Sequence, residues 1–163
     1  MRIFKTAPLL AIITLLFLPF AHVCGQSNNR IVVSKKNFTL CVISETNDTI
    51  CQFPCAVGKV KGNKTKVGDC KTPEGTFKVI QIQNSTSWTH DFKDGGGVRQ
   101  GAYGPWFIRL QVPGASGIGI HGTCFPESIG TRATEGCIRL LNEDLQKLIP
   151  YVSINMTCII EPD

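Results

Sequence analysis

The stretch IGIHGT at residues 118–123, together with TEGCIRL at residues 134–140, decides the interpretation of this chain. Each segment joins a short apolar run, typical of a β-strand, to a polar motif that a strand end would carry. His121 and Cys137 stand 16 positions apart, so one loop between neighbouring strands can bring an imidazole and a thiol together. The sequence therefore predicts two adjacent strand ends that share a reactive site.

Cys137 is predicted to be a nucleophile and His121 its general base. A free thiol is only slightly ionised near neutral pH, and a neighbouring imidazole lowers its pKa by forming a thiolate–imidazolium pair. Gly136 leaves room for a substrate carbonyl, and the backbone N–H groups of Gly136 and Cys137 can point at a developing oxyanion. Taken singly, Cys137 could be half of a disulfide and His121 a structural histidine. The joint pattern favours the reactive pair.

Other side chains near this pair are candidates for binding substrate. If residues 137–139 are extended, Arg139 lies on the same face as Cys137. It could then hold a substrate carboxylate, or it could form a structural salt bridge. The Thr134 hydroxyl could orient the imidazole, bind substrate or stabilise a turn. Further substrate contacts are expected from three residues: Thr123, Trp88 and Tyr103.

The composition indicates one folded, β-rich domain. The chain has 163 residues, of which 42% are hydrophobic and 18% charged, and this excludes a disordered tail, a collagen-like fibre and a coiled coil. Short β-branched runs between turn signals predict about seven strands in a sandwich-like, mainly β fold. The strand expected at residues 76–83 has apolar residues on both faces, so we expect both faces to be buried. One short helix is expected between Asn142, its predicted N-cap, and Pro150.

The longest polar segment, residues 84–103, contains three consecutive glycines. A long glycine-rich loop in a compact domain is usually a mobile segment or a functional flap, so a capping loop is expected here. His90 within it is interpreted as a solvated loop residue, with substrate contact as the alternative.

Residues 1–25 are predicted to be a secretory signal peptide, which leaves residues 26–163 as the mature domain. Arg2 and Lys5 precede an apolar run that is too short to span a bilayer. An uncleaved anchor is an alternative, and lipidation of Cys24 is disfavoured because the residues before it fit such a site poorly. Cleavage lowers the formal charge from +5 to +3, too weak to indicate binding to nucleic acid or membranes. We expect an exported, periplasmic or cell-wall-associated monomer.

Eight cysteines in so short a chain indicate an oxidising compartment. Cys24 leaves with the signal peptide and Cys137 is expected to stay free, so an even set remains for disulfides of open connectivity. Cys41 and Cys51 flank a predicted hairpin turn and are a plausible cross-strand pair. Cys124 is the doubtful member, because it follows the IHGT motif and could be oxidised against Cys137.

Together these motifs resemble the L,D-transpeptidase catalytic domain, a family of cysteine-dependent enzymes that cross-link or modify bacterial peptidoglycan. The resemblance runs through most of the mature chain, including KTPEGTF at 71–77 and GPW at 104–106, and is most specific in IHGT and GCIRL. It implies a single domain in which Cys137 is acylated, His121 is the base and Arg139 is the motif arginine. Backbone amides around the cysteine would form the oxyanion hole.

One departure from the family pattern concerns the group that orients the imidazole. The family usually has serine three residues before the cysteine, and this chain has Thr134 there. The added methyl narrows the choice of rotamers, which puts the orienting role of this hydroxyl in doubt. The backbone carbonyl of Gly122 is an alternative acceptor for the imidazole N–H.

The resemblance also implies a two-step acyl transfer on peptidoglycan stem peptides. Cys137 would attack the carbonyl between the L-centre of a diamino acid and a terminal D-Ala, releasing D-Ala and leaving a thioester. An amine of a second stem would take the acyl group, whereas attack by water would make the enzyme an L,D-carboxypeptidase. Carbapenems are expected to acylate the same cysteine, and no cofactor or metal is expected. The non-enzymatic alternative is a disulfide-stabilised module that binds cell-wall peptide, with Cys137 in a bridge.

Overall fold

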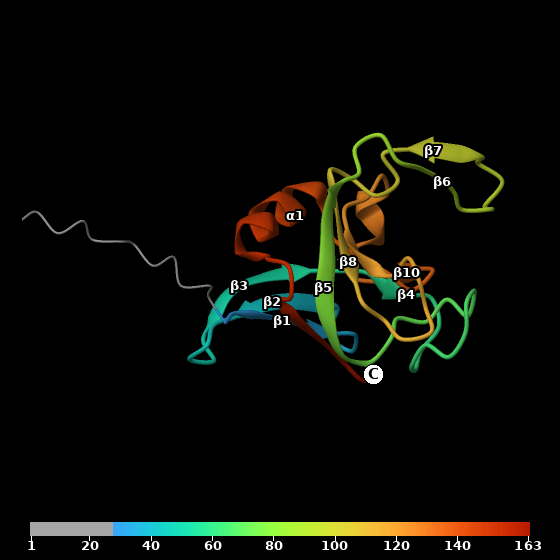
Figure 1. Cartoon of the computed structure of the whole chain (residues 1–163). Helices are drawn as coiled ribbons and strands as arrows, with labels where there is room; N and C mark the ends of the chain where they lie inside the picture. Colours follow the sequence, from blue (N-terminus) through green and yellow to red (C-terminus); the bar gives the residue numbers. More distant parts are fainter. Residues whose placement is uncertain (1–27) are drawn as a thin grey trace, which may run out of the picture.

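The computed structural model describes residues 28–163, so the predicted signal peptide and Cys24 lie outside the described part (Figure 1). Its strands are β1 (Arg30–Ser34), β2 (Thr39–Ile43), β3 (Thr49–Pro54), β4 (Val57–Gly58), β5 (Gly75–Asn84), β6 (Thr89–Asp91), β7 (Val98–Gln100), β8 (Trp106–Leu110), β9 (Gly119–His121), β10 (Arg132–Thr134), β11 (Ile138–Arg139) and β12 (Thr157–Glu161). Its helical elements are α1 (Asn142–Leu148) and the 3₁₀ turns η1 (Pro126–Ser128) and η2 (Ile149–Tyr151).

The prediction of a mainly β domain with one short α-helix is confirmed, but the expected number of strands is too low. The described residues form twelve strands, and three of the additional ones, β6, β7 and β10, are three-residue strands. They lie within segments whose Gly and polar residues predict loops. Three residues carry too little alternation for a strand to be recognised in the sequence. Such short strands form because they pair with partners that the fold brings beside them.

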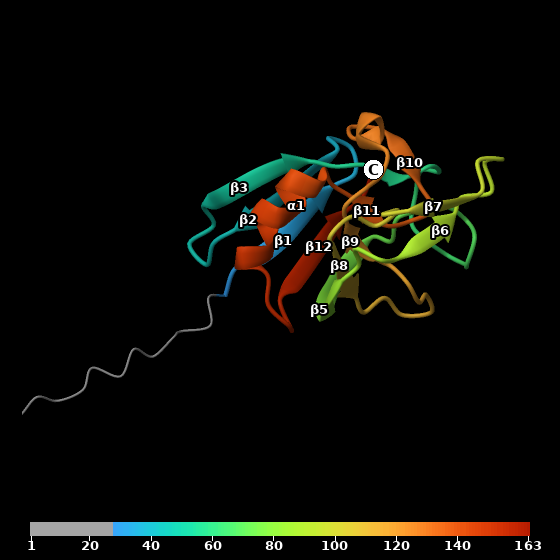
Figure 2. The same ribbon diagram turned by 90° about the horizontal axis from the view of Figure 1, so that it is seen from above.

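One curled sheet forms most of the molecule, with the strand order β11-β9-β8-β5-β12-β1-β2-β3 (Figure 2). The chain leaving β3 returns to the opposite edge, where Ala56 and Arg139 exchange two backbone hydrogen bonds of 2.8 and 2.9 Å. The sandwich-like packing expected from the sequence therefore arises from a sheet that curls until its two ends meet. The strand that closes the curl, β11, directly follows Cys137.

The core lies inside the curl, on one face of the alternating strands. Strands β1, β2 and β12 alternate between buried and less buried residues, as expected for a sheet with one face packed on the core. Helix α1 covers the core with Leu145 and Leu148 (Figure 1). The prediction that residues 76–83 are buried on both faces is wrong: Phe77 and Val79 are buried, but Ile80 is 40% exposed. A β-bulge after Val79 further interrupts the alternation.

Asn142 does not cap α1 as predicted. The N-cap position is Leu141, which has no capping side chain, and Asn142 is the first helical residue. The Asn142 amide instead bridges to the backbone of Thr123, accepting from its N–H at 2.8 Å and donating to its carbonyl at 3.0 Å. The start of α1 thereby holds the segment that follows His121. The expected end of the helix before Pro150 is confirmed, since Pro150 lies in η2.

The seven cysteines of the described residues are all free thiols. The predicted Cys41–Cys51 pair is contradicted by the register of β2 and β3, which places Cys41 opposite Gln52 and Val42 opposite Cys51. Residues directly opposite each other share a face, so the two cysteines project from opposite faces of the hairpin. Within residues 28–163, no helix combines the length and apolar character needed to cross a membrane.

Candidate active site

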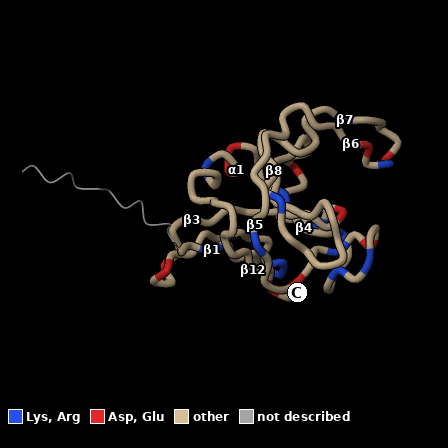
Figure 3. The backbone as a smooth tube through the Cα atoms, in the orientation of Figure 1, with Lys and Arg blue, Asp and Glu red and all other residues tan. Residues whose placement is uncertain are grey.

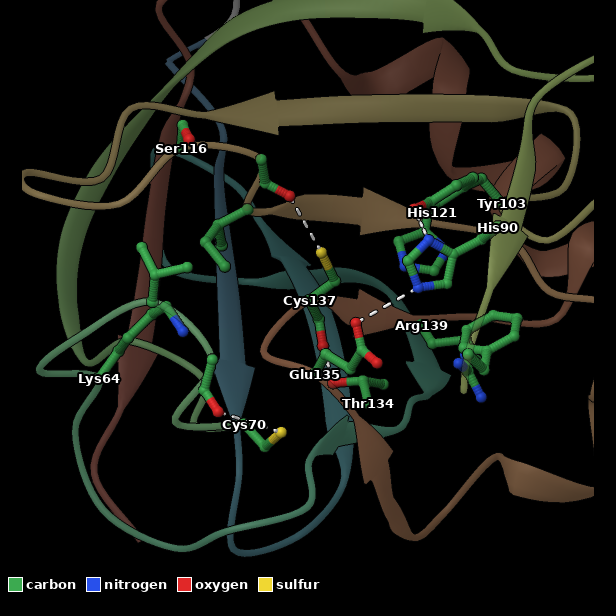
Figure 4. A pocket seen from close by; sticks show the side chains of 15 residues that line it. Lys64, Cys70, His90, Tyr103, Ser116, His121, Thr134, Glu135, Cys137 and Arg139 are labelled. Atoms are coloured by element: carbon green, nitrogen blue, oxygen red, sulfur yellow. Dashed lines mark hydrogen bonds and ion pairs between the residues drawn. The ribbon is translucent and has the colours of Figure 1, made fainter. Parts of the chain in front are cut away.

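The two motifs meet at one edge of the sheet, as predicted. Strands β9 and β11 are parallel neighbours, with Arg139 opposite His121 and Ile138 opposite Ile120. Cys137 immediately precedes β11 and therefore lies close to the end of β9. Both the thiol and the imidazole line a cleft of about 390 Å³ (Figure 4). The cleft is lined by Lys64, Val67, Gly68, Cys70, His90, Phe92, Tyr103, Ser116, Gly117, Ile118, His121, Thr134, Glu135, Cys137 and Arg139.

The Cys137 thiol is held protonated by its surroundings. Its Sγ–H donates to the carbonyl of Gly117 at 3.4 Å, as Figure 4 shows. Burial raises the pKa of the thiol to about 11, although a backbone hydrogen bond from Gly119 and the charges of Arg139 and Lys64 act in the opposite direction. Burial therefore favours the neutral thiol over the thiolate.

The His121 imidazole is neutral and fixed in one orientation. The residue is 3% exposed, and its Nδ1 lies 2.6 Å from the carbonyl of Gly122, which can only accept. The ring stacks on Phe107 at 5.6 Å between centroids and meets the edge of Tyr103 at 5.0 Å. Burial lowers the pKa of His121 to about 3, outweighing the hydrogen bond to Gly122. The proton therefore sits on Nδ1, and the lone pair of Nε2 is free to accept one.

These two pKa directions oppose the formation of the thiolate–imidazolium pair expected from the sequence. Such a pair needs the thiol pKa to fall and the imidazole pKa to rise, and burial moves each of them the other way. Burial therefore favours a neutral acid at Cys137 and a neutral base at His121. Of the two groups proposed to orient the imidazole, it is the carbonyl of Gly122 that contacts it.

Thr134 and Gly136 shape the turn that presents Cys137. The Thr134 hydroxyl donates to the carbonyl of Cys137 at 2.7 Å and accepts from the N–H of Gly136 at 3.1 Å. Gly136 has φ +135°, and a Cβ there would lie 2.8 Å from the backbone oxygen of Lys71. Glycine is therefore required by this close backbone approach, whereas the sequence suggested room for substrate. Because Thr134 takes the Gly136 N–H, that group is occupied in the structure.

Arg139 is a buried cation with unused hydrogen-bonding capacity. It is 4% exposed, its Nη1 donates to Ser128 Oγ at 2.9 Å, and its Nε has no partner among the described residues. Its guanidinium lies 5.7 and 5.9 Å from the ring centroids of Phe92 and Phe125. No salt bridge to Arg139 forms within residues 28–163, which contradicts the structural alternative. Its position on the cleft fits the binding of a substrate anion.

The predicted capping loop contains the β6–β7 hairpin, and His90 on it reaches the cleft. His90 Nε2 lies 3.3 Å from a carboxylate oxygen of Glu135, and its Nδ1 lies 3.1 Å from the Tyr103 hydroxyl. The interpretation of His90 as a solvated residue is therefore wrong. The hairpin is joined by these contacts to the loop that carries Cys137, and Figure 4 shows His90 between Glu135 and Tyr103.

The structure separates two predicted substrate-binding residues from the cleft. Thr123 is 4% exposed, and its backbone groups are both taken by Asn142. Trp88 lines an adjoining pocket, which shares Tyr103 with the main cleft. Cys124 lines a third pocket, so the cysteine that shares the cleft with Cys137 is Cys70.

Two cleft residues, Lys64 and Cys70, come from a loop that the sequence marks only as Gly- and Lys-rich. Lys64 forms a 2.8 Å ion pair with Asp69. Nothing in the spacing of this loop points to the motifs about 70 residues later, because their contact depends on the curl of the sheet. Across residues 28–163, no group of three His, Cys, Asp or Glu side chains is placed to hold a metal ion.

Comparisons with known proteins agree with this arrangement. The family model of the L,D-transpeptidase catalytic domain matches residues 28–160. The putative L,D-transpeptidase YkuD of Bacillus subtilis is 30% identical over 120 residues, which is 74% of this chain and 57% of that protein. The chain thus spans less than two thirds of the length of this relative.

Solved structures share the fold at low identity. A Mycobacterium tuberculosis L,D-transpeptidase 3 in complex with a faropenem-derived adduct is similar with a TM-score of 0.60 and 16% identity, over 83% of this chain and 60% of that one. The catalytic domain of the Enterococcus faecium L,D-transpeptidase is similar with a TM-score of 0.58 and 18% identity, over 81% and 95%. The chain belongs to the L,D-transpeptidase catalytic domain family.

Proposed function

We propose that this protein is an exported peptidoglycan L,D-transpeptidase with Cys137 as nucleophile and His121 as general base. The observation that carries the proposal is the placement of a protonated thiol and a neutral imidazole in one cleft, with Nδ1 of the imidazole fixed on Gly122. This arrangement is an acid–base pair suited to acyl transfer. Family membership supports the same reaction.

The neutral pair implies that the proton moves during the attack. As Sγ bonds to the scissile carbonyl carbon, its proton passes to Nε2 of His121, and the carbonyl electrons move onto oxygen. The N–H of Cys137 has no acceptor among the described residues, so we assign the oxyanion to it, and Gly136 is removed from that role by Thr134. Collapse of the tetrahedral intermediate expels the amine of D-Ala, which takes the proton back from the imidazolium and leaves a thioester on Cys137.

The second step reverses these roles. An amine of a second stem peptide attacks the thioester carbonyl and gives a proton to Nε2 of His121. The Cys137 thiolate leaves and is reprotonated by the imidazolium, so the neutral pair is restored. Attack by water in place of the amine yields a carboxylate and makes the reaction a carboxypeptidase reaction.

The remaining groups bind substrate in this proposal. Arg139 takes the carboxylate of the terminal D-Ala, because it is a buried cation whose Nε has no protein partner. Phe92 and Tyr103 cover the reacting atoms from the hairpin side of the cleft. The relative from M. tuberculosis carries a faropenem-derived adduct, which supports acylation of Cys137 by related β-lactams such as carbapenems. The alternative of a non-catalytic module needs Cys137 in a bridge, and Cys137 is a free thiol.

Mass spectrometry tests the proposal directly. The purified protein is incubated with a carbapenem, or with a muropeptide tetrapeptide in the presence and absence of an amine-bearing acceptor stem. We expect a covalent adduct on Cys137 with the carbapenem and a cross-linked peptide with both stems present. Cys137→Ala is the control and should give neither, and Thr134→Ala should slow acylation less than His121→Ala. Adduct formation by Cys137→Ala would refute the assignment, and a product that is only trimmed would identify a carboxypeptidase.

A further inference from the structure

We infer that this protein is modified by asparagine-linked glycans at the first residue of its Asn-x-Thr triplets. The triplets, none of which has proline in the middle, begin at Asn37, Asn47, Asn63, Asn84 and Asn155. The inference does not depend on the chemistry proposed for Cys137. It requires only that the chain is exported, which is part of the proposed function.

The triplets are more frequent than the composition of the chain explains. The chain has eight asparagines, and five of them have a threonine two positions later. With 14 threonines among 163 residues, random placement gives fewer than one such triplet. The excess therefore needs a cause in the structure or in a modification that reads this pattern.

The folded chain places all five of these asparagines at exposed positions. Four of them lie in turns or loops between elements, and Asn84 is the last residue of β5. Figure 3 shows one of these segments, the turn between β2 and β3 with its acidic residues, at the end of the sheet away from the β6–β7 hairpin. A glycan is bulky and hydrophilic, so only surface positions can carry one. None of the five lines the candidate active-site cleft, which the glycans therefore leave open.

The side-chain nitrogen that receives a glycan is not engaged at any of the five sites. Within residues 28–163, no Nδ2 atom of a triplet asparagine donates a hydrogen bond, whereas three of these side chains use their oxygen. Oδ1 of Asn47, Asn63 and Asn84 accepts hydrogen bonds of 2.7, 2.8 and 3.0 Å, respectively. Because a glycan is attached to Nδ2 and leaves Oδ1 in place, these contacts are compatible with the modification.

Asparagines outside the triplets differ in this respect. Asn142 Nδ2 donates to the carbonyl of Thr123 at 3.0 Å, and Asn28 Nδ2 donates to the carboxylate of Glu45 at 3.2 Å. In the part of the chain that the structure describes, these are the two asparagine Nδ2 atoms with an acceptor. The nitrogens that take part in the fold therefore lie outside the triplets.

Local structure explains only some of the triplets. Asn47 and Asn155 have φ values of +68° and +69°, which asparagine adopts more readily than most residues. Threonine is favoured in strands, and the threonines of three triplets each begin a strand: Thr39, Thr49 and Thr157. Thr65 and Thr86, which complete the other two triplets, lie outside the strands. A turn followed by a strand therefore does not account for the whole set.

The modification is a group transfer onto the amide nitrogen. Nδ2 attacks the anomeric carbon of an oligosaccharide carried on a lipid diphosphate, and a C–N bond forms. The C–O bond between the sugar and the diphosphate breaks, and the lipid diphosphate leaves with its electron pair. The amide nitrogen loses one proton, so the product is a neutral N-linked glycan. The lipid-linked donor and its transferase are supplied by the compartment through which the chain is exported.

Glycosidase treatment of the full protein, isolated from the cells that naturally secrete it, tests the inference. A peptide-N-glycosidase acting in water labelled with heavy oxygen converts each glycan-bearing asparagine into a labelled aspartate, which mass spectrometry locates. We expect a loss of apparent mass on a denaturing gel and the label at all five triplets. Asn28 is the matched control, because it is exposed but has Arg30 in place of the threonine, and it should carry no label.

The outcomes separate a glycan from a turn that merely contains the pattern. Absence of label at all five sites would overturn the inference, and an unlabelled triplet would overturn the assignment of that asparagine. Equal labelling of Asn28 would show spontaneous deamidation and would also overturn it. Asn47→Asp keeps an acceptor oxygen for Arg30 and should remove the mass of one glycan; an unchanged mass would contradict the assignment of Asn47. Failure of the proposed function shows separately, as absence of a carbapenem adduct on Cys137 of the same protein.

Discussion

Alkylation of Cys137 as a function of pH separates the neutral pair from a thiolate–imidazolium pair. The thiol pKa is raised to about 11 by burial, so at pH 7 about one molecule in 10⁴ carries the thiolate. An unperturbed cysteine of pKa about 8.5 is ionised to about 3% at that pH, a difference of roughly two orders of magnitude. Iodoacetamide should therefore modify Cys137 far more slowly than an exposed thiol.

The assay follows modification of the peptide that contains Cys137 by mass spectrometry between pH 6 and 10.5. We expect the rate to rise about tenfold per pH unit up to at least pH 10, with no plateau near neutrality. His121→Ala should leave this profile almost unchanged, because the imidazole of the resting protein is neutral. The same variant should slow acylation by a peptide substrate by about 10²–10⁴-fold, since the general base is lost.

A plateau of the alkylation rate below pH 7 that disappears in His121→Ala would refute this reasoning. It would show that the imidazole ionises the thiol before substrate binds. Cys70 provides an internal comparison, because it is a second thiol that lines the same cleft, and its Sγ–H donates to the carbonyl of Gly68 at 3.7 Å. Rates for the two peptides can be compared in one digest.

Three further predictions concern stability. Lys35→Met should lower the free energy of unfolding, measured in urea, by about 2–4 kcal/mol. The reason is that the Lys35 ammonium is buried, pairs with Glu74 and donates to the Gly62 carbonyl. Lys36→Met is the control and should change this free energy little, because Lys36 is exposed. Gly136→Ala should lower the free energy of unfolding more than Gly130→Ala, because residue 130 also has a positive φ but leaves open space for a Cβ. Backbone strain alone accounts for about 1–3 kcal/mol. Equal shifts of the melting temperature in the two variants would contradict the contact of residue 136 with the Lys71 backbone. Because the pKa of His121 is lower in the folded chain, the unfolded chain binds a proton on this imidazole more readily. The free energy of unfolding should therefore fall by up to about 1.4 kcal/mol per pH unit as the pH drops below about 6.5. This fall should be smaller in a His121→Gln variant.

Much of the fold and the reactive pair can be predicted from local patterns. The β-rich runs of β1, β2 and β3 and the helix before Pro150 are continuous in sequence, so their alternation and end signals suffice. Cys137 and His121 are recognisable because each motif lies at the end of one short apolar run. The short strands of the capping hairpin are not, because their pairing depends on contacts such as that of His90 with Glu135.

Several functions of single residues were decided by packing. Asn142 is of a residue type that often caps a helix, yet its side-chain amide forms hydrogen bonds with the backbone of Thr123. It does so because the chain after β9 passes close to the start of α1. Gly136 is required by the backbone of Lys71, which lies more than 60 positions earlier. Neither partner can be inferred from residues nearby in sequence.

By itself the sequence determined the mainly β class, the family and the two side chains proposed to react, because these depend on residue type and on spacing within two short motifs. The tertiary structure decided the burial of the pair, the identity of the imidazole's acceptor and the presence of Lys64 on the same cleft. Those properties depend on burial and on distances between segments far apart in the chain. The curl that joins Ala56 to Arg139 brings those segments together. The burial that results favours the neutral form of each side chain, whereas the sequence alone suggests an ion pair.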